Sequence, residues 1–193
     1  GGRKMSKEIA TKNPSAGADN LKVLVKMSML VAISIAMVYL IRFPIFPVVS
    51  FLEYDPADIP ILIGTFCFGT TAGLLLTIVT SVIQGLTVSA GSGLYGILMH
   101  VIATGVLVLV SGTIYQRHKT KLTAAVGLVC GMAAMASVMV GANLIITPLF
   151  MGVSRDVVWD LMAFIVGFNV IKAGINGLVT FLVYKRISHF LHK

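Results

Sequence analysis

The chain has 193 residues, of which 57% are hydrophobic and only 11% are charged. Because a soluble domain carries about 25% charged residues, this composition excludes an ordinary soluble domain and indicates an integral membrane protein. The length fits one helical bundle and leaves no room for a second, soluble domain. We identify no secretory signal peptide, because no small-residue cleavage site follows the first apolar run.

The N-terminal part alternates between polar, apolar and proline-rich stretches. Residues 1–20 form a polar tail, in which we interpret residues 1–4, before Met5, as an expression scar. The first apolar run extends from about residue 22 to 41 and leads into RFPIFPVVSFLEYDPADIP. Four prolines in this stretch exclude a regular helix across it, so we expect a long loop with a short extended piece.

The remaining apolar runs predict five more helices. The run from 57 to 88 exceeds the roughly 20 residues of one span and is interrupted by FGTTAG, so we split it near Gly69–Gly73 into a short helix and a longer one. Further helices are expected at about 94–115, 122–146 and 157–184. The fold class is therefore an all-α, six-helix transmembrane bundle, with residues 21–193 as one domain. A misplaced split would make the count five or seven.

Basic residues predict the orientation of this bundle. They precede the first helix, fill the loop after the fourth and follow the last, at Lys7, Lys12, Lys22, Lys26, Arg117, Lys119, Lys121, Lys185, Arg186 and Lys193. Six helices place all three groups on one side, which the positive-inside rule makes cytoplasmic. Both termini are therefore expected in the cytoplasm, and the net charge of +8 gives no indication of nucleic-acid binding.

Three polar residues share one face of the last expected helix, because Asn169, Lys172 and Asn176 are spaced three and four apart. A lysine at the centre of a membrane helix costs about 2.5–3.5 kcal/mol and usually faces a partner or a cavity. Lys172 could pair with an acid or extend to the interface. We find no acid at matching depth, since Asp58 and Asp160 lie near the outer helix ends. This favours a polar cavity that holds a ligand.

Other residues have both a structural and a functional interpretation. Asn143, His100 and Gln84 are typical of interhelical hydrogen bonds, but each could contact a ligand. Trp159, Tyr54 and Tyr95 fit an aromatic belt, or could stack on a flat ring. Small residues four apart indicate close helix packing, at Ala32/Ala36, Gly69/Gly73 and Gly127/Gly131. Cys67 and Cys130 are interpreted as small core residues.

The chain lacks the sequence features of an enzyme or a motor. It has no GxxxxGK[ST] phosphate loop, no HExxH and no cluster of metal ligands. We therefore predict a protein that is not an enzyme and has neither a metal site nor a cofactor.

The proline-rich stretch runs directly into ILIGTFCFGTTAG, and this combination resembles the riboflavin-binding S components, the RibU type, of energy-coupling factor (ECF) vitamin transporters. The matching residues are Asp55, Asp58, Ile59, Pro60, Leu62, Ile63, Gly64, Phe68, Gly69, Ala72 and Gly73. Thr70 stands where that family usually has proline.

The resemblance implies that the chain lies in the cell membrane of a bacterium and captures riboflavin from outside as a transported substrate. A transmembrane coupling protein and two ATPase subunits would supply the energy. The resemblance implies substrate contacts at Asn169 and Lys172, and we add Asn143, Glu53, Tyr54, Tyr95 and Trp159. The loop Arg42–Pro56 resembles a lid, with Arg42, Phe43, Phe46 and Asp55 as its candidate residues. Ala32 and Ala36 resemble the docking motif for the coupling protein.

Several alternatives stay open. Lys172 argues against cationic thiamine, but it would suit the carboxylates of biotin or a folate. A small membrane enzyme would need clustered acids or a nucleophile with a base, and we find neither. A scaffolding subunit would bind no small molecule, and a channel would need a longer polar stripe.

Overall fold

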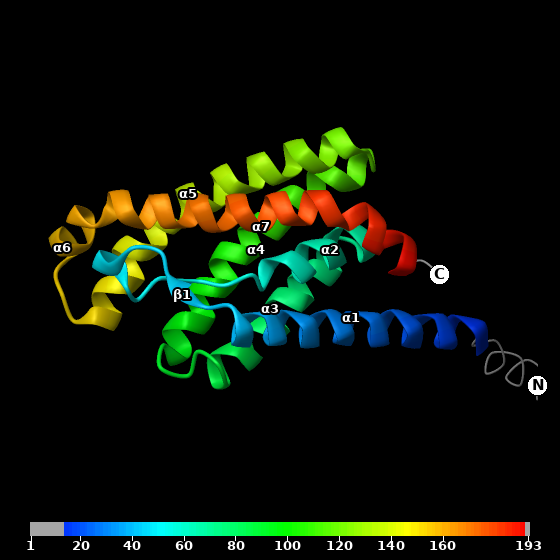
Figure 1. Ribbon diagram of the computed structural model, residues 1–193, viewed down its shortest axis with the longest axis horizontal. Coiled ribbons are helices and arrows are strands. Elements are labelled where there is room, and N and C mark those ends of the chain that lie inside the picture. The colour runs from blue at the N-terminus through cyan, green and yellow to red at the C-terminus, as the bar shows by residue number, and fades with distance from the viewer. Residues whose placement is uncertain (1–13, 192–193) are drawn as a thin grey trace, which may run out of the picture.

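A computed structural model of the chain describes residues 14–191, with side chains from 19 to 187, as a bundle of helices (Figure 1). The longer helices are α1 (Pro14–Leu40), α2 (Asp58–Phe68), α3 (Thr70–Leu86), α4 (Gly93–Arg117), α5 (Lys121–Met151) and α7 (Met162–Leu191), and a short α6 spans Arg155–Asp160. Between α1 and α2 lie strand β1 (Phe43–Pro44), the 3-10 helix η2 (Pro47–Val49) and strand β2 (Glu53–Tyr54). The all-helical fold class is confirmed.

Four of the described helices are long and apolar enough to cross a membrane, within Asp19–Leu40, Gly93–Arg117, Lys121–Met151 and Met162–Ile187. The chain is thus a multi-pass membrane protein. α2 and α3 are apolar but shorter. At 1.5 Å per residue, the 11 residues of α2 extend about 16 Å, well short of a bilayer core of about 30 Å.

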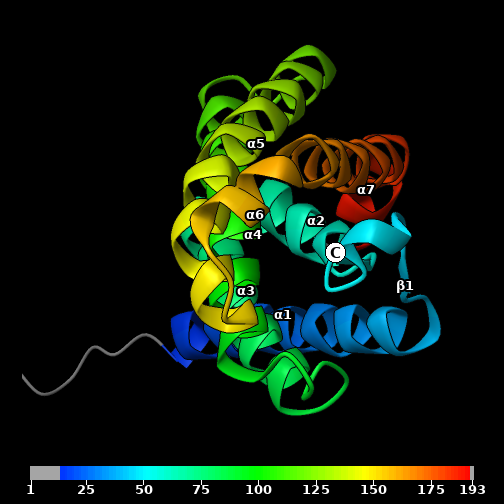
Figure 2. The ribbon, with the colours of Figure 1, turned by 90° about the vertical axis from the view of Figure 1, so that its left-hand side faces the viewer.

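α2 is the centre of the bundle. All its residues except Phe68 are buried, and it packs against α1, α3, α4 and α7. Figure 2 shows α2 between α1 and α7. Because neighbouring helices enclose α2 on all sides, its residues after Asp58 are mostly apolar all round the helix rather than on one face.

The predicted split of the second apolar run is confirmed at Gly69. This residue separates α2 from α3 and has a φ of 104°, a backbone conformation that favours glycine. Thr70 is then the first residue of α3. Proline is favoured at that position of a helix, so the threonine and the proline usual in the related family both fit the turn.

Several predicted helix boundaries differ from the structure. α1 begins at Pro14, eight residues before the expected start at residue 22, since proline is tolerated in the first helical turn. α5 continues through Pro148 to Met151, where Gly152 ends it with a φ of 66°, so the loop expected from residue 147 is wrong. The last helix is interrupted at Leu161, which separates α6 from α7.

The proline-rich segment, residues 42–57, folds onto α7. β1 and β2 form a two-stranded antiparallel sheet that pairs Phe43 with Tyr54 and Pro44 with Glu53. An apolar cluster joins this segment to α6 and α7, through Val49, Leu52, Tyr54, Val158, Met162, Ile165 and Phe168. The segment is therefore packed against the helices instead of extending from them as a free loop.

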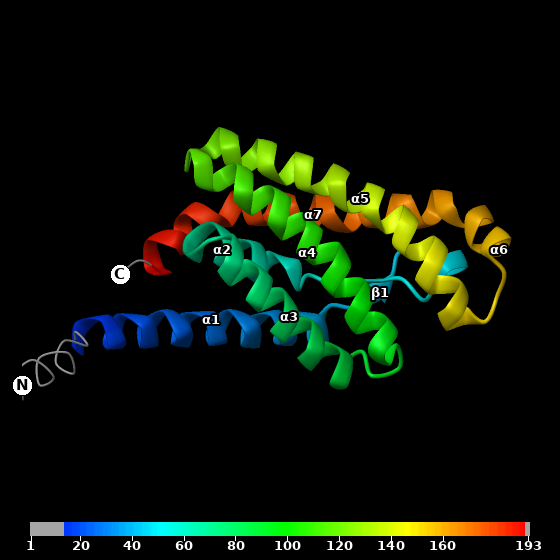
Figure 3. The same cartoon turned by 180° about the vertical axis from the view of Figure 1, so that it is seen from behind.

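One end of the bundle gathers three features that are distant in sequence. The described start of α1, the turn between α4 and α5 and the end of α7 lie at the same end in Figures 1 and 3. The basic residues Lys22, Arg117, Lys119 and Lys185 belong to these parts of the chain. The sequence-based grouping of basic residues thus matches their arrangement in space.

Small residues allow close helix contacts, as their spacing predicts. A Cβ added at Gly127 of α5 would lie 2.8 Å from the backbone oxygen of Ser111 in α4, and one at Gly131 would lie 3.0 Å from Leu107 O. Of the two cysteines, Cys67 is buried as expected, but Cys130 is exposed on α5. The interpretation of Cys130 as a core residue is therefore wrong.

We expect Gly127→Ala to destabilise the protein by about 1–3 kcal/mol, because the new methyl group meets backbone that must shift. For a chain of this length, each kcal/mol lowers Tm by about 2–4 °C. Gly141→Ala on the same helix is the matched control, since a Cβ there meets nothing within 4 Å. Thermal unfolding in detergent measures both variants, and equal Tm values would contradict the packing argument.

Candidate functional site

The polar face predicted on the last helix points into the protein. Asn169, Lys172 and Asn176 of α7 are 3%, 7% and 0% exposed. Lys172 and Asn176 meet polar groups of the proline-rich segment and the start of α2, and Asn169 donates to Ile165 O of its own helix. The site is therefore built between α7 and the chain that precedes α2.

Lys172 forms an ion pair, which corrects one conclusion from the sequence. Its Nζ donates to Asp55 Oδ2 at 2.8 Å, and Asp55 Oδ1 accepts a hydrogen bond from the backbone of Ala57. The prediction that no acid lies near Lys172 is wrong, because it considered only the acids within the expected helices. Asp55 precedes α2 and is carried into the bundle by the inward fold of the segment, where it is 5% exposed.

Asn176 connects the segment to α2. Its Oδ1 accepts from the Tyr54 hydroxyl at 2.9 Å, and its Nδ2 donates to the backbone oxygen of Asp55 and to Asp58 Oδ2, both at 3.0 Å. One amide side chain thus satisfies three buried groups. Asp58 is the first residue of α2, at the helix end where the sequence places it, but it is fully buried and within reach of α7, which the sequence did not predict.

Asp58 continues this polar network into α3 and α4. Its Oδ1 accepts from Thr104 at 2.6 Å and lies 3.4 Å from His100 Nε2. His100 Nδ1 lies 2.6 Å from the hydroxyl of Ser81. Buried polar groups need such partners because desolvation without them costs free energy. The network therefore fixes α2, α3, α4 and α7 relative to one another.

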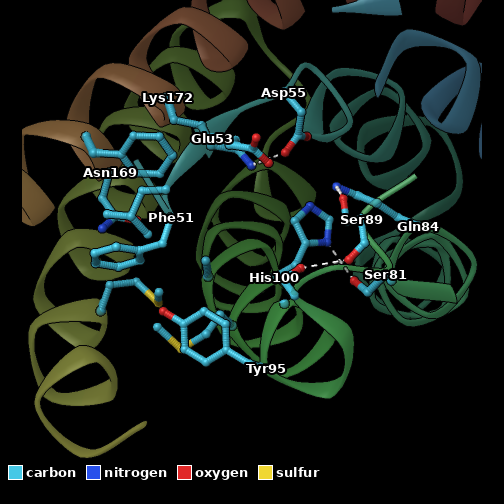
Figure 4. A pocket seen from close by; sticks show the side chains of 18 of the residues that line it. Phe51, Glu53, Asp55, Ser81, Gln84, Ser89, Tyr95, His100, Asn169 and Lys172 are labelled. Atoms are coloured by element: carbon cyan, nitrogen blue, oxygen red, sulfur yellow. Dashed lines mark hydrogen bonds and ion pairs between the residues drawn. The ribbon is translucent and has the colours of Figure 1, made fainter. Parts of the chain in front are cut away.

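A cavity lies beside this network (Figure 4). Polar side chains enter it from both sides, with Asn169 and Lys172 on α7 and with Ser81, Gln84 and His100 on α3 and α4. The rest of the cavity wall is apolar and includes Phe51, Leu52, Met99, Met135, Met139 and Phe168. A cavity with apolar surfaces and a few convergent polar groups is typical of a small-molecule site.

The formal charges around the cavity are already paired. Arg42 contacts both Glu53 and the backbone oxygen of Val88, and Lys172 contacts Asp55. Arg42 thereby connects the proline-rich segment to the loop between α3 and α4. The two cations and two anions that line the cavity balance, so its surface presents hydrogen-bonding groups without excess charge.

The structure brings six of the predicted site residues to the cavity, namely Asn169, Lys172, Glu53, Tyr95, Arg42 and Asp55. Tyr95 also stacks on Phe150, with ring centroids 4.0 Å apart. These six residues come from the proline-rich segment, α4 and α7.

The other predicted site residues lie outside the cavity lining. Tyr54 is bonded to Asn176, and Asn143 is buried with hydrogen bonds only inside α5. Trp159 on α6 is 61% exposed, which fits the aromatic-belt interpretation. Phe43 packs on Tyr54 and Phe46 on Phe164, so both phenylalanines anchor the segment.

The candidate docking residues Ala32 and Ala36 are exposed on α1 and do not line the cavity. Sequence reasoning left Gln84, His100 and Ser81 out of the site. Gln84 and His100 are polar residues inside apolar helices, and this feature of the sequence could have assigned them to the site.

Comparison with known proteins identifies the family of the chain. The model of the family described as ECF transporter, substrate-specific component matches residues 22–186. The chain belongs to this family of ECF transporter S components.

Two relatives show the extent of this similarity. The S component is 27% identical over 179 residues to riboflavin transporter RibU of Staphylococcus aureus (strain TCH60), covering 89% of this chain and 93% of that protein. It is 29% identical over 119 residues to riboflavin transporter RibU of Lactococcus lactis subsp. cremoris (strain NZ9000), covering 61% and 57%.

A solved structure also matches the S component. It is described as "Structure and mechanism of the S component of a bacterial ECF transporter" and superposes with a TM-score of 0.79 at 27% identity, over 90% of this chain and 99% of that one. The family and this structure confirm that the chain is a membrane transport component and not an enzyme.

Proposed function

We propose that this S component binds riboflavin in the cavity between α7 and α3/α4 and delivers it for uptake. Two proteins named riboflavin transporter RibU are among its relatives, and one match spans 93% of that relative. Riboflavin has an uncharged ring system with carbonyl and nitrogen groups, and a chain of hydroxyls. A cavity with apolar surfaces and polar groups on both sides suits the chemistry of such a molecule, and its volume of about 120 Å³ means that the lining must move apart to admit it.

The paired charges of the cavity favour an uncharged vitamin as the ligand. Lys172 would suit the carboxylate of biotin or a folate if it were unpaired, but its Nζ lies 2.8 Å from Asp55. Arg42 is likewise paired with Glu53. A carboxylate ligand would have to displace one of these acids or lie beside it, which like-charge repulsion opposes. A neutral ligand can use the remaining donors of Lys172 without breaking the ion pair.

Asn169 and Lys172 are the proposed polar contacts. Asn169 donates to the backbone oxygen of Ile165, which leaves its amide oxygen, an acceptor, for the ligand. Lys172 has three donors and gives one to Asp55. Tyr95 and Phe51 offer aromatic surface for the ring. Glu53 lines the cavity as the partner of Arg42 in an ion pair. Asn143, Tyr54 and Trp159 would reach the ligand only after a rearrangement.

The proposal includes a topology and partners. Residues 21–193 form one substrate-binding domain that crosses the membrane six times, with both termini cytoplasmic. The burial of α2 among four helices and the gathering of basic residues at one end support this arrangement. A transmembrane coupling protein and two ATPase subunits supply the energy. The exposed Ala32 and Ala36 contact the coupling protein, and the proline-rich segment acts as the lid, through Arg42, Phe43, Phe46 and Asp55.

We expect the detergent-purified protein to bind one riboflavin per chain. Bound flavin absorbs visible light, and titration should quench flavin fluorescence. Excess biotin or folate should not displace the flavin, because the cavity has no unpaired cation. A colourless protein that quenches no flavin fluorescence would overturn the riboflavin assignment and leave the family assignment intact. Displacement by a carboxylated vitamin would point to that vitamin instead.

A further inference from the structure

Two polar atoms on one side of the cavity lack hydrogen-bond partners. Among the described residues, five buried side-chain nitrogen or oxygen atoms are unpartnered, and two of these are Gln84 Oε1 and His100 Nε2. Both residues line the cavity, from α3 and α4, and they lie on the side away from Asn169 in Figure 4. Because buried polar groups are rarely left unpaired, this pair indicates a ligand contact.

The neighbours of Gln84 fix which end of its amide is spare. Its Nε2 donates to the hydroxyl of Ser89 at 3.4 Å, and the Gln84 side chain is 8% exposed. The remaining Oε1 can only accept a hydrogen bond. An occupant must therefore bring an O–H or N–H donor to this position, and a ring carbonyl cannot fill it.

The neighbours of His100 leave its other ring nitrogen to an occupant. Ser81 has one hydroxyl hydrogen, and it donates to the backbone oxygen of Thr77 at 2.6 Å. With that hydrogen on Thr77 O, the hydroxyl accepts from His100, and Nδ1 carries a hydrogen. Nε2 lies 3.4 Å from Asp58 Oδ1, a contact that is an ion pair only when the ring is charged. In the neutral ring Nε2 is an acceptor without a donor, and a ligand hydroxyl can supply that donor.

We propose that Gln84 and His100 form a second polar subsite, which binds the hydroxyl-bearing chain of the ligand. This inference rests on the proposed riboflavin binding and assigns the two ends of the molecule. The ring carbonyls face the donors on α7, and the hydroxyls face Gln84 and His100. The subsite favours the polyol chain, because that chain offers several hydroxyl donors to Gln84 Oε1, whereas the ring system has a single donor, its imide N–H.

The test compares riboflavin with lumiflavin, which has the same ring and a methyl group in place of the polyol chain. Both ligands are titrated against detergent-purified wild type, Gln84→Met and His100→Phe, with flavin fluorescence as the readout. We expect wild type to prefer riboflavin. Each variant should bind riboflavin about tenfold more weakly, the loss of one buried hydrogen bond. Lumiflavin binding should change less than twofold.

Thr80→Val is the matched control. Thr80 lies on α3 like Gln84, is fully buried and has an unpartnered hydroxyl, but it does not line the cavity. Its loss should alter the affinity for neither flavin. Gln84→Glu keeps an acceptor oxygen and should retain more riboflavin affinity than Gln84→Met.

Three results would overturn the subsite. Equal losses for both flavins would show that Gln84 and His100 only support the fold. Unchanged riboflavin affinity in both variants would remove them from the site. Equal affinity of wild type for the two flavins would show that the hydroxyl chain is not recognised. If wild type bound neither flavin, the proposed function itself would fail, and the subsite with it.

Discussion

Replacement of Lys172 by methionine is expected to weaken riboflavin binding well over tenfold, which exceeds about 1.4 kcal/mol. Among the described residues of α7, Lys172 is the one charged side chain that lines the cavity. Methionine keeps the length of the side chain but removes all three donors. Fluorescence titration with riboflavin measures the change, and unchanged affinity would remove Lys172 from the site.

The ion pair requires a second variant, because Lys172→Met leaves Asp55 buried without its cation. Breaking a buried pair on one side costs about 3–5 kcal/mol, and Asp55 is only 5% exposed. We therefore expect a large fall in Tm for Lys172→Met. Asp55→Asn combined with Lys172→Met removes both charges and should recover much of the lost stability.

The double variant separates ligand contact from structural support. If Lys172 binds the ligand, the double variant regains Tm but stays more than tenfold weaker toward riboflavin. If Lys172 only holds Asp55 in place, the double variant regains riboflavin affinity together with stability. The second result would contradict the proposed contact.

The sequence predicted the helices and their polar face, since both depend on local patterns. Asn169, Lys172 and Asn176 share a face at any depth of a helix, and the turn at Gly69 follows from a glycine between two apolar runs. Pro148 misled the prediction of α5. A proline is a reliable helix breaker in water, but membrane helices tolerate it when neighbouring groups satisfy the backbone.

The sequence could not place Asp55 and Asp58. Both lie in or beside the proline-rich segment, and acids beside a helix end are ordinarily assigned to the surface. Their burial depends on contacts over more than one hundred residues, from α7 to the segment. No periodicity encodes a pairing of that separation. For the same reason the sequence predicted an unpaired Lys172, because its partner Asp55 lies outside the predicted helices.

The buried ion pair of Lys172 and Asp55 changes which class of ligand Lys172 indicates. An unpaired lysine would favour an anionic substrate, whereas a lysine already neutralised by Asp55 offers hydrogen bonds without net charge. The structure thus alters the inference from the same residue. It favours a neutral ligand for a physical reason that the sequence did not contain.

Asn176→Ala is expected to loosen the proline-rich segment more than any other single change of a neutral residue in the network. Asn176 is fully buried and serves the Tyr54 hydroxyl, the Asp55 carbonyl and the Asp58 carboxylate. Alanine leaves all three without this partner, and each unsatisfied buried group costs about 1–3 kcal/mol. Hydrogen exchange measured by mass spectrometry should show faster exchange across residues 43–57 in the variant.

Asn143→Ala is the matched control for this experiment. Asn143 is another fully buried asparagine in the middle of a long helix, but its side chain bonds only to Met139 and Thr147 of the same helix. Its loss should leave exchange in the proline-rich segment unchanged. If both variants increased exchange there equally, the effect would be a general loss of stability. If Asn176→Ala left exchange unchanged, the segment would be held by its apolar cluster on α6 and α7 instead of by the polar network.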